Sequence, residues 1–133
     1  MEKNYNHQNT EERIYQIWED GKYFSPIIDK KKRPFTIILP LPNANDPMHM
    51  GHSLFTVQDI LIRYHRMRGE PTLWLPGADH AGIETQFVFE KYLAKEGKSR
   101  FDFDRETLYQ MIWEFVEKNR EINMSQMKRL GFS

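Results

Sequence analysis

The chain of 133 residues has the length of one ordinary domain, and its 39% hydrophobic and 14% aromatic content can build a core. Nineteen basic residues balance nineteen acidic ones, so the composition gives no broad basic footprint for nucleic acid. The lack of cysteine excludes disulfides, cysteine-ligated zinc and thiol nucleophiles, and no apolar run reaches the roughly 20 residues of a membrane span. We expect a cytoplasmic protein without a membrane partner.

The first part of the chain predicts a helix and a connector. Asn9 or Thr10 is a candidate cap for a helix that ends at Gly21, because apolar residues recur on one of its faces. The basic run at residues 30–33 suits either a solvated loop or a phosphate-binding loop. We assign this run no chemistry.

The next part of the chain predicts a strand, a helix and a second strand. The run Phe35–Leu39 is apolar almost throughout, which suits a strand buried on both faces of a parallel sheet. Residues 50–67 have the spacing of an amphipathic helix, with apolar residues on one side and polar residues on the other. Residues 71–76 predict the second strand, and the whole segment has the length of a βαβ crossover. The apolar side of the helix comprises Leu54, Val57, Ile60, Leu61, Tyr64 and Met67, opposite Gln58, Asp59, Arg63 and Arg66.

Two further helices are predicted at residues 82–96 and 104–130. Gly97 would end the first helix, while Asp104 would cap the second and Gly131 would stop it. Parallel strands joined by helices indicate an α/β fold.

Residues 42–52 lie between the first predicted strand and the helix that follows it. In a parallel sheet this junction is at the carboxyl end of the strand, where ligands bind, and the start of a helix favours phosphate. His49 and His52 are three residues apart, so both can face one bound group and donate hydrogen bonds to phosphate oxygens. Gly51 between them leaves room for a base or a sugar. The spacing alone also allows capping or core histidines, or a metal pair.

Asp79 follows the end of the second predicted strand. Its carboxylate can therefore reach the same crevice and pair with a cationic amino group through a charge-assisted hydrogen bond. The alternative is a cap for the helix that begins at Gly82, and the two roles are not exclusive.

Several motifs together resemble one enzyme family. His49-Met50-Gly51-His52 is similar to the HIGH signature of class I aminoacyl-tRNA synthetases. Residues 72–86, with the wording Pro-Gly-Ala-Asp-His-Ala-Gly-Ile, resemble the valyl type of that family, and so do residues 58–64 and 128–133. The resemblance covers nearly the whole chain, from the helix around residues 14–18 to the last residue.

The resemblance implies a fold and a reaction. Residues 34–133 would form the first half of a Rossmann-type (HUP-like) nucleotide-binding domain with parallel strands and crossover helices, preceded by an amino-terminal helix and connector at residues 1–33. The implied reaction activates valine with ATP and Mg²⁺ to valyl-adenylate and then transfers the valyl group to tRNA(Val). No tightly bound cofactor and no protein metal site are expected.

The resemblance also assigns roles to residues of this chain. His49 and His52 would be catalytic and would bind ATP together with Gly51, whereas Pro42, Asn43 and Asp79 would bind the amino acid. It places His80 near the active site without a defined role there. No covalent nucleophile is needed, because the carboxylate of the amino acid attacks the α-phosphorus itself.

The chain departs from the family pattern in two ways. Residues 44–46 read Ala-Asn-Asp where valyl enzymes usually have Val-Thr-Gly, so Asp46 replaces a glycine whose backbone freedom the loop uses. The 133 residues also contain no KMSKS loop, editing domain or anticodon domain. We therefore expect half of an adenylation site that is inactive or weakly active alone, with tRNA held mainly by regions outside these residues. A small nucleotidyltransferase and a non-catalytic binding module are the alternatives.

Overall fold

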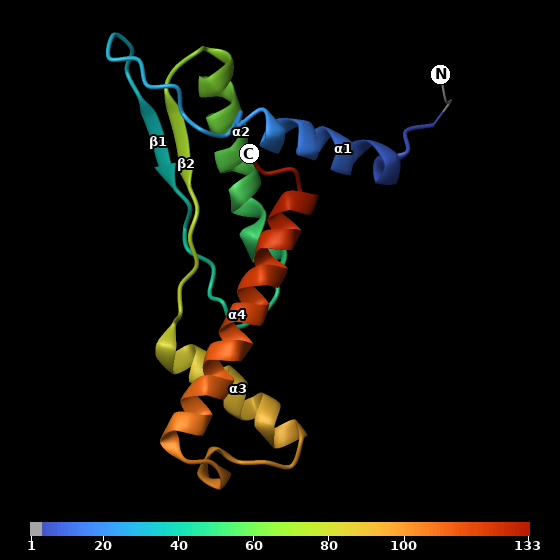
Figure 1. Cartoon of the computed structure of the whole chain (residues 1–133), viewed down its shortest axis with the longest axis vertical. Coiled ribbons are helices and arrows are strands. Elements are labelled where there is room, and N and C mark those ends of the chain that lie inside the picture. Colours follow the sequence, from blue (N-terminus) through green and yellow to red (C-terminus); the bar gives the residue numbers. More distant parts are fainter. Residues whose placement is uncertain (1–3) are drawn as a thin grey trace. The chain divides into compact units, whose positions relative to one another are not determined.

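The computed structural model describes residues 4–133 and divides them into two compact units (Figure 1). Unit 1 consists of residues up to Leu39, Ser53–Pro76 and Gln126–Ser133, and unit 2 of Pro40–His52 and Gly77–Ser125. The sequence-based boundary between residues 33 and 34 stays a prediction. In chain order the elements are α1 (His7–Asp20), β1 (Phe35–Ile38), the 3₁₀ helix η1 (Met50–Ser53), α2 (Leu54–Met67), β2 (Thr72–Leu75), α3 (Gly82–Lys95), the 3₁₀ helix η2 (Arg100–Asp102) and α4 (Arg105–Arg129).

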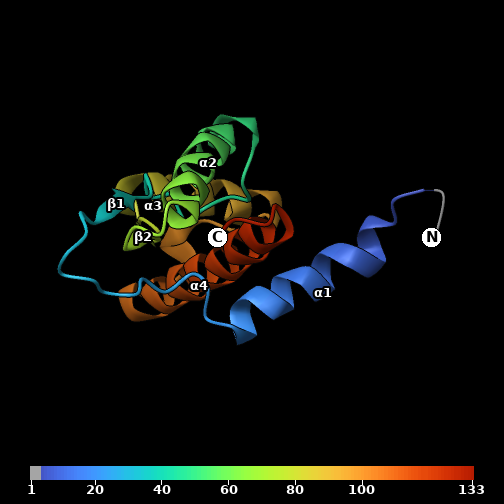
Figure 2. The ribbon, with the colours of Figure 1, turned by 90° about the horizontal axis from the view of Figure 1, so that it is seen from above.

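Unit 1 contains a parallel pair of strands. β1 pairs with β2 in a register that runs from Phe35 opposite Thr72 to Ile38 opposite Leu75, and α2 packs against both strands (Figure 2). This arrangement confirms the predicted α/β fold with parallel strands. The predicted burial of β1 on both faces was wrong, because side chains alternate across a strand and Ile38 is 66% exposed.

The buried side of α2 is not the apolar side that the helical spacing defines. Its buried residues are Phe55, Asp59 and Ile62, which are spaced four and three residues apart and therefore share one side of the helix. All six residues of the predicted apolar side are exposed, namely Leu54, Val57, Ile60, Leu61, Tyr64 and Met67. The polar residue Asp59 thus lies inside, and the apolar stripe lies outside.

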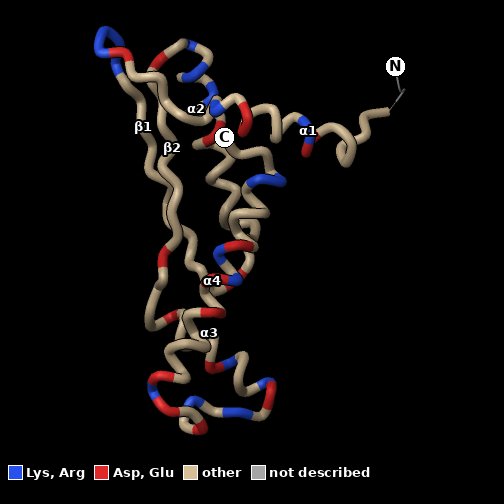
Figure 3. Tube along the Cα trace, in the orientation of Figure 1, with Lys and Arg blue, Asp and Glu red and all other residues tan. Residues whose placement is uncertain are grey.

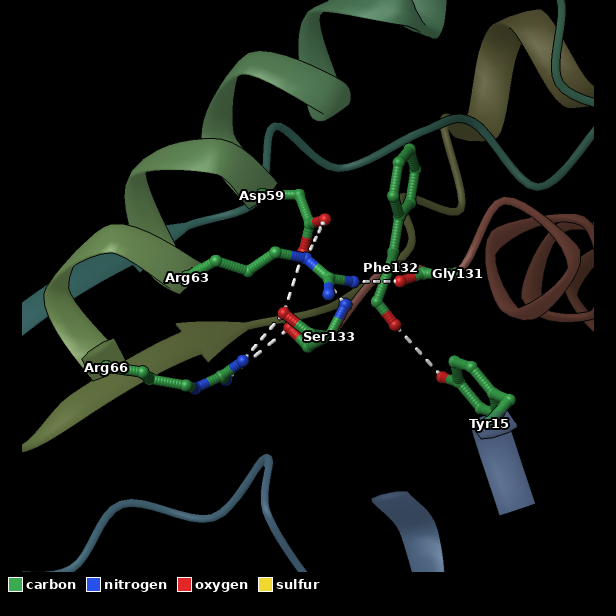
Figure 4. Close-up of polar contacts among 7 residues, drawn as sticks. All are labelled: Tyr15, Asp59, Arg63, Arg66, Gly131, Phe132 and Ser133. Atoms are coloured by element: carbon green, nitrogen blue, oxygen red, sulfur yellow. Dashed lines mark hydrogen bonds and ion pairs between the residues drawn. The ribbon is translucent and has the colours of Figure 1, made fainter. Parts of the chain in front are cut away.

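Hydrogen bonds between α2 and the last residues of the chain explain this orientation (Figure 4). The carboxylate of Asp59 accepts from the backbone N–H and the hydroxyl of Ser133, at 3.0 and 2.7 Å, and from Nε of Arg63 at 2.6 Å. Arg63 also donates to the carbonyl of Gly131, and Arg66 donates to Oγ of Ser133 at 2.6 Å. Because charge-assisted bonds satisfy these groups, the polar side of α2 can be the buried one.

The backbone next to Ser133 is held from other elements of unit 1. The hydroxyl of Tyr15 in α1 donates to the carbonyl of Phe132 at 3.1 Å (Figure 4). The ring of Phe132 lies 5.5 Å from that of Trp74 in β2 and 6.4 Å from that of Phe55 in α2, measured between centroids. The end of the chain is therefore part of the core of unit 1.

Two predicted helix starts can be compared with the structure. α1 begins earlier than expected, since its cap is Asn6, whose side chain accepts from the N–H of Asn9, and not Asn9 or Thr10. Gly21 ends α1 as predicted. Asp104 caps α4 as predicted, because its Oδ1 accepts from the two N–H groups of the first turn.

Unit 2 is built on the contact between α3 and α4. The rings of Phe89 and Phe115 are 5.4 Å apart, and Leu93 of α3 and Val116 of α4 are buried. The short helix η2, which the sequence patterns did not predict, starts with a capping box between Ser99 and Asp102. The contact between the two helices thus forms the core of this unit.

The distribution of charge matches the balanced composition. Lys and Arg on one hand and Asp and Glu on the other occur in short, interspersed groups along the trace (Figure 3). The basic residues 30–33 are all exposed, and Nζ of Lys32 donates to the carbonyl of Gly69 at 2.8 Å. Within residues 4–133, none of the helices combines the length and the apolar content needed to cross a bilayer.

Candidate functional site

Every residue predicted to carry chemistry belongs to unit 2. The loop that follows β1 contributes residues 42–52, and the loop that follows β2 contributes Asp79. The two loops are joined by an isolated parallel bridge between Asn43 and Asp79. The backbone N–H of Asp79 donates to the carbonyl of Pro42, and the N–H of Ala44 donates to the carbonyl of Asp79, both at 2.9 Å. The bridge therefore fixes Pro42, Asn43 and Asp79 as one group.

The carboxylate of Asp79 is held at one oxygen. Its Oδ1 accepts from the backbone N–H of Ala81 at 2.9 Å, and in the part of the chain that the structure describes its Oδ2 accepts no hydrogen bond. The cap residue of α3 is Ala81, not Asp79, although Asp79 supplies the acceptor for that residue. The carboxylate is exposed, so one oxygen supports the loop while the other faces solvent.

Ala81 has an uncommon backbone conformation. Its φ of 44° and ψ of 52° lie in the left-handed region, which costs a residue with a Cβ roughly 1–3 kcal/mol. The hydroxyl of Thr85 donates to the carbonyl of His80 at 2.6 Å, and the N–H of Thr85 donates to the carbonyl of Ala81 at 2.8 Å. These bonds hold the turn in place from the side of α3.

Gly51 and the two histidines form a compact cluster at the start of η1, which His49 directly precedes. A 3₁₀ helix has three residues per turn, so side chains three apart lie above one another, and the rings of His49 and His52 are 4.4 Å apart. A Cβ on residue 51 would lie 2.7 Å from Cε1 of His49. A side chain at residue 51 would therefore displace the exposed ring of His49, in addition to filling any room that Gly51 leaves for a ligand.

Nδ1 of each histidine contacts the backbone of the same loop. Nδ1 of His49 accepts from the backbone N–H of Gly51 at 3.0 Å, so in a neutral ring of His49 the proton is on Nε2. Nδ1 of His52 lies 3.0 Å from the backbone nitrogen of His49 and 3.2 Å from its carbonyl oxygen, so the tautomer of His52 decides whether Nδ1 accepts or donates. His49 is exposed, whereas His52 is half-buried.

The substitution at Asp46 does not strain the loop. Among residues 4–133, only Lys22 and Ala81 are non-glycine residues with a positive φ. The left-handed conformation that a glycine or an aspartate would favour is therefore not used at residue 46. Ala44 is fully buried and Pro42 is buried as well, so the loop packs tightly around the bridge.

Glu84 is a site residue that the sequence analysis missed. Its Oε2 accepts from Nδ2 of Asn43 at 2.5 Å. The site then contains the carboxylates of Asp79 and Glu84, and residues 40–52 and 77–84 contain no Lys or Arg. The local charge is negative. Among residues 4–133 no group of three or more His, Asp or Glu side chains has an arrangement that could hold a metal ion.

Comparison with known families decides which family the chain belongs to. The sequence model described as "tRNA synthetases class I (I, L, M and V)" matches residues 13–133. The chain belongs to the class I tRNA synthetases. The predicted family is thereby confirmed over almost the whole chain.

Relatives within this synthetase family are named Valine--tRNA ligase. The protein of Treponema denticola is 48% identical over all of this chain, and the chloroplastic/mitochondrial protein 2 of Arabidopsis thaliana is 50% identical over 94% of it. The chain spans 15% and 13% of the lengths of these two relatives.

A solved structure supports the fold of this synthetase chain. The LeuRS of Agrobacterium radiobacter K84, solved in a ternary complex with tRNA and LeuAMS, matches 97% of the chain with a TM-score of 0.78 and 20% sequence identity. The chain spans 15% of that protein. At this identity the likeness concerns the fold, and it confirms the α/β architecture of a class I synthetase catalytic domain.

Proposed function

We propose that this chain supplies one part of the adenylation site of a valyl-tRNA synthetase. In the proposed reaction a carboxylate oxygen of valine attacks the α-phosphorus of ATP and pyrophosphate leaves with its Mg²⁺. The valyl group then passes from the adenylate to a hydroxyl of tRNA(Val), and AMP leaves. The specificity for valine is supported by the relatives named Valine--tRNA ligase, which match 94–100% of the chain at 48–50% identity. The observation that carries the site is the bridge between Asn43 and Asp79.

The carboxylate of Asp79 is proposed to bind the α-ammonium group of valine. One of its oxygens is already fixed by the N–H of Ala81, so the other can accept from an ammonium without further ordering of the side chain. The absence of Lys and Arg from the two loops supports a site for a cation, because no nearby positive charge competes for the carboxylate. Pro42 and Asn43 would border the same ligand, since the bridge holds them beside Asp79.

His49 and His52 are proposed to face the phosphate of the adenylate. The two rings lie 4.4 Å apart at one end of the loop, so their N–H groups could donate together to the oxygens of an α-phosphate whose charge shifts during attack. The two loops contain no Lys or Arg that could neutralise a triphosphate. The Mg²⁺ of ATP and cationic groups outside these two loops would have to do so, and we therefore expect weak activation of valine by the isolated chain.

A titration tests this proposal. A non-hydrolysable valyl-adenylate mimic is added to the chain and to its Asp79→Asn variant, and binding is followed by calorimetry. Asparagine keeps an acceptor for the N–H of Ala81 but removes the charge, so we expect binding to weaken by about tenfold to a hundredfold. Asp79→Ala is less informative, because it would also remove the acceptor for the N–H of Ala81 and so disturb the turn itself.

Asp102→Asn provides a matched control. Asp102 also accepts from a backbone N–H, that of Ser99, at 2.6 Å, but in the capping box of η2. We expect this variant to bind the mimic as the unchanged chain does. A chain that binds no mimic, or an Asp79→Asn variant that binds it with full affinity, would contradict the proposed role of the site.

A further inference from the structure

Glu84 occupies a position where glutamate normally caps a helix. It is the third residue of α3, and a glutamate there usually reaches back to the N–H of the cap residue. In this chain that N–H, on Ala81, already donates to Oδ1 of Asp79 at 2.9 Å. Glu84 is therefore released from capping, and its carboxylate accepts from Nδ2 of Asn43 at 2.5 Å instead.

This hydrogen bond determines how the amide of Asn43 is turned. A carboxylate can only accept, so the NH₂ group of Asn43 must face Glu84 and its carbonyl oxygen must point away. The backbone of Asn43 is itself fixed by the bridge to Asp79. Asn43 consequently presents an acceptor, and not a donor, on the side away from Glu84.

We propose that Glu84 is a positioning residue that turns Asn43 into an acceptor for the α-ammonium group of the amino-acid substrate. This inference rests on the proposed function, because it assigns the same ligand to the same site. An ammonium group has three donors. Oδ2 of Asp79 and Oδ1 of Asn43 provide two acceptors for it, and the carboxylate of Glu84 adds negative charge. The site would accordingly prefer primary ammonium compounds over carboxylic acids that lack the amino group.

Two ligands separate this proposal from a general effect on binding. One is the valyl-adenylate mimic, and the other is its des-amino counterpart, in which isovaleryl replaces valyl. We expect Glu84→Ala to weaken binding of the valyl mimic by about tenfold and to leave binding of the des-amino mimic unchanged. Glu84→Gln should lose less affinity for the valyl mimic than Glu84→Ala does, because the amide oxygen of the glutamine can still accept from Asn43.

Coupling to Asn43 is the second part of the test. In an Asn43→Ala background, Glu84→Ala should cause clearly less further loss than it does alone, because the group that it positions is gone. Glu106→Ala is the matched control, since it removes a glutamate from the first turn of α4, and it should bind both mimics normally. The side-chain NH₂ signals of Asn43, followed by NMR without ligand, should shift more in Glu84→Ala than in Glu84→Gln.

The outcomes distinguish this proposal from the function on which it rests. Three results would overturn the positioning role while the unchanged chain still binds the valyl mimic. They are an equal loss of affinity for both mimics in Glu84→Ala, an equal loss of affinity in Glu84→Gln and Glu84→Ala, and unchanged NMR signals of Asn43 in Glu84→Ala. A chain that binds neither mimic would overturn the proposed function and this inference with it.

Discussion

The contact between Asp59 and the end of the chain makes a quantitative prediction about stability. Asp59→Ala removes the acceptor of three hydrogen bonds and leaves the N–H of Ser133 without a partner. Breaking a fully buried ion pair costs about 3–5 kcal/mol, but the side chain of Arg63 is 36% exposed and regains water. We therefore expect a loss of about 3 kcal/mol in the free energy of unfolding. Asp59→Asn keeps one acceptor for Ser133 and should lose about 1.5 kcal/mol.

Unfolding in urea measures this loss. Tryptophan fluorescence is a suitable signal, because the ring of Trp74 lies 5.5 Å from that of Phe132 next to the contact. Asp20→Ala is the control, since Asp20 is an exposed aspartate of the same unit that, within residues 4–133, accepts only from Gln16. Asp59→Ala could instead lower the free energy of unfolding by less than about 0.5 kcal/mol, with an unchanged dependence of that free energy on urea concentration. This result would refute the stabilising role of the contact between Asp59 and Ser133.

Three further predictions concern single residues. Gly131→Ala should lower the free energy of unfolding by about 1 kcal/mol, because φ at residue 131 is +72°. Gly82→Ala is the control and should not lower it, since a Cβ would meet no neighbour at either position and residue 82 has no positive φ. Urea unfolding compares the two variants. Tyr15→Phe should remove one late-titrating phenol from an absorbance titration, since burial raises the pKa of Tyr15 above 10.0 and its contribution to stability is lost only as the pH rises past that value. Hydrogen bonds from α4, first that of the Thr107 hydroxyl, lower the pKa of Asp104. Asp104→Ala should therefore reduce the free energy of unfolding at neutral pH, and this difference from the unchanged chain should shrink as the pH falls below 3.8. Urea unfolding at several pH values measures the difference.

Local sequence patterns predicted the elements better than their packing. The strands, the end of α1 at Gly21 and the cap at Asp104 depend on residues within a few positions of one another, so their signals are visible in the sequence. The orientation of α2 depends on Ser133, which is 74 residues from Asp59 in the chain. Periodicity shows which residues are apolar, but it does not show which side of a helix meets the core when a distant partner satisfies the polar side.

The candidate site shows the same division. The pairing of Asn43 with Asp79 could be anticipated, because loops at the carboxyl ends of neighbouring parallel strands start side by side. The contact of Glu84 with Asn43 could not, since a glutamate in the first turn of a helix is expected to cap it. The available signal was Asp79 two residues before the cap residue Ala81, which is a competing acceptor for the same N–H.

The strained turn before α3 links the fold to the proposed chemistry. Ala81 adopts a left-handed conformation, and its N–H is held by the carboxylate of Asp79 while Thr85 holds the carbonyl of His80. The unfavourable free energy of this backbone conformation is already included in the folded state, so ligand binding does not add it again. The side chain that stabilises the turn is the one proposed to bind the ammonium group. A stiff acceptor at Asp79 and a released glutamate at residue 84 are therefore two consequences of one hydrogen bond.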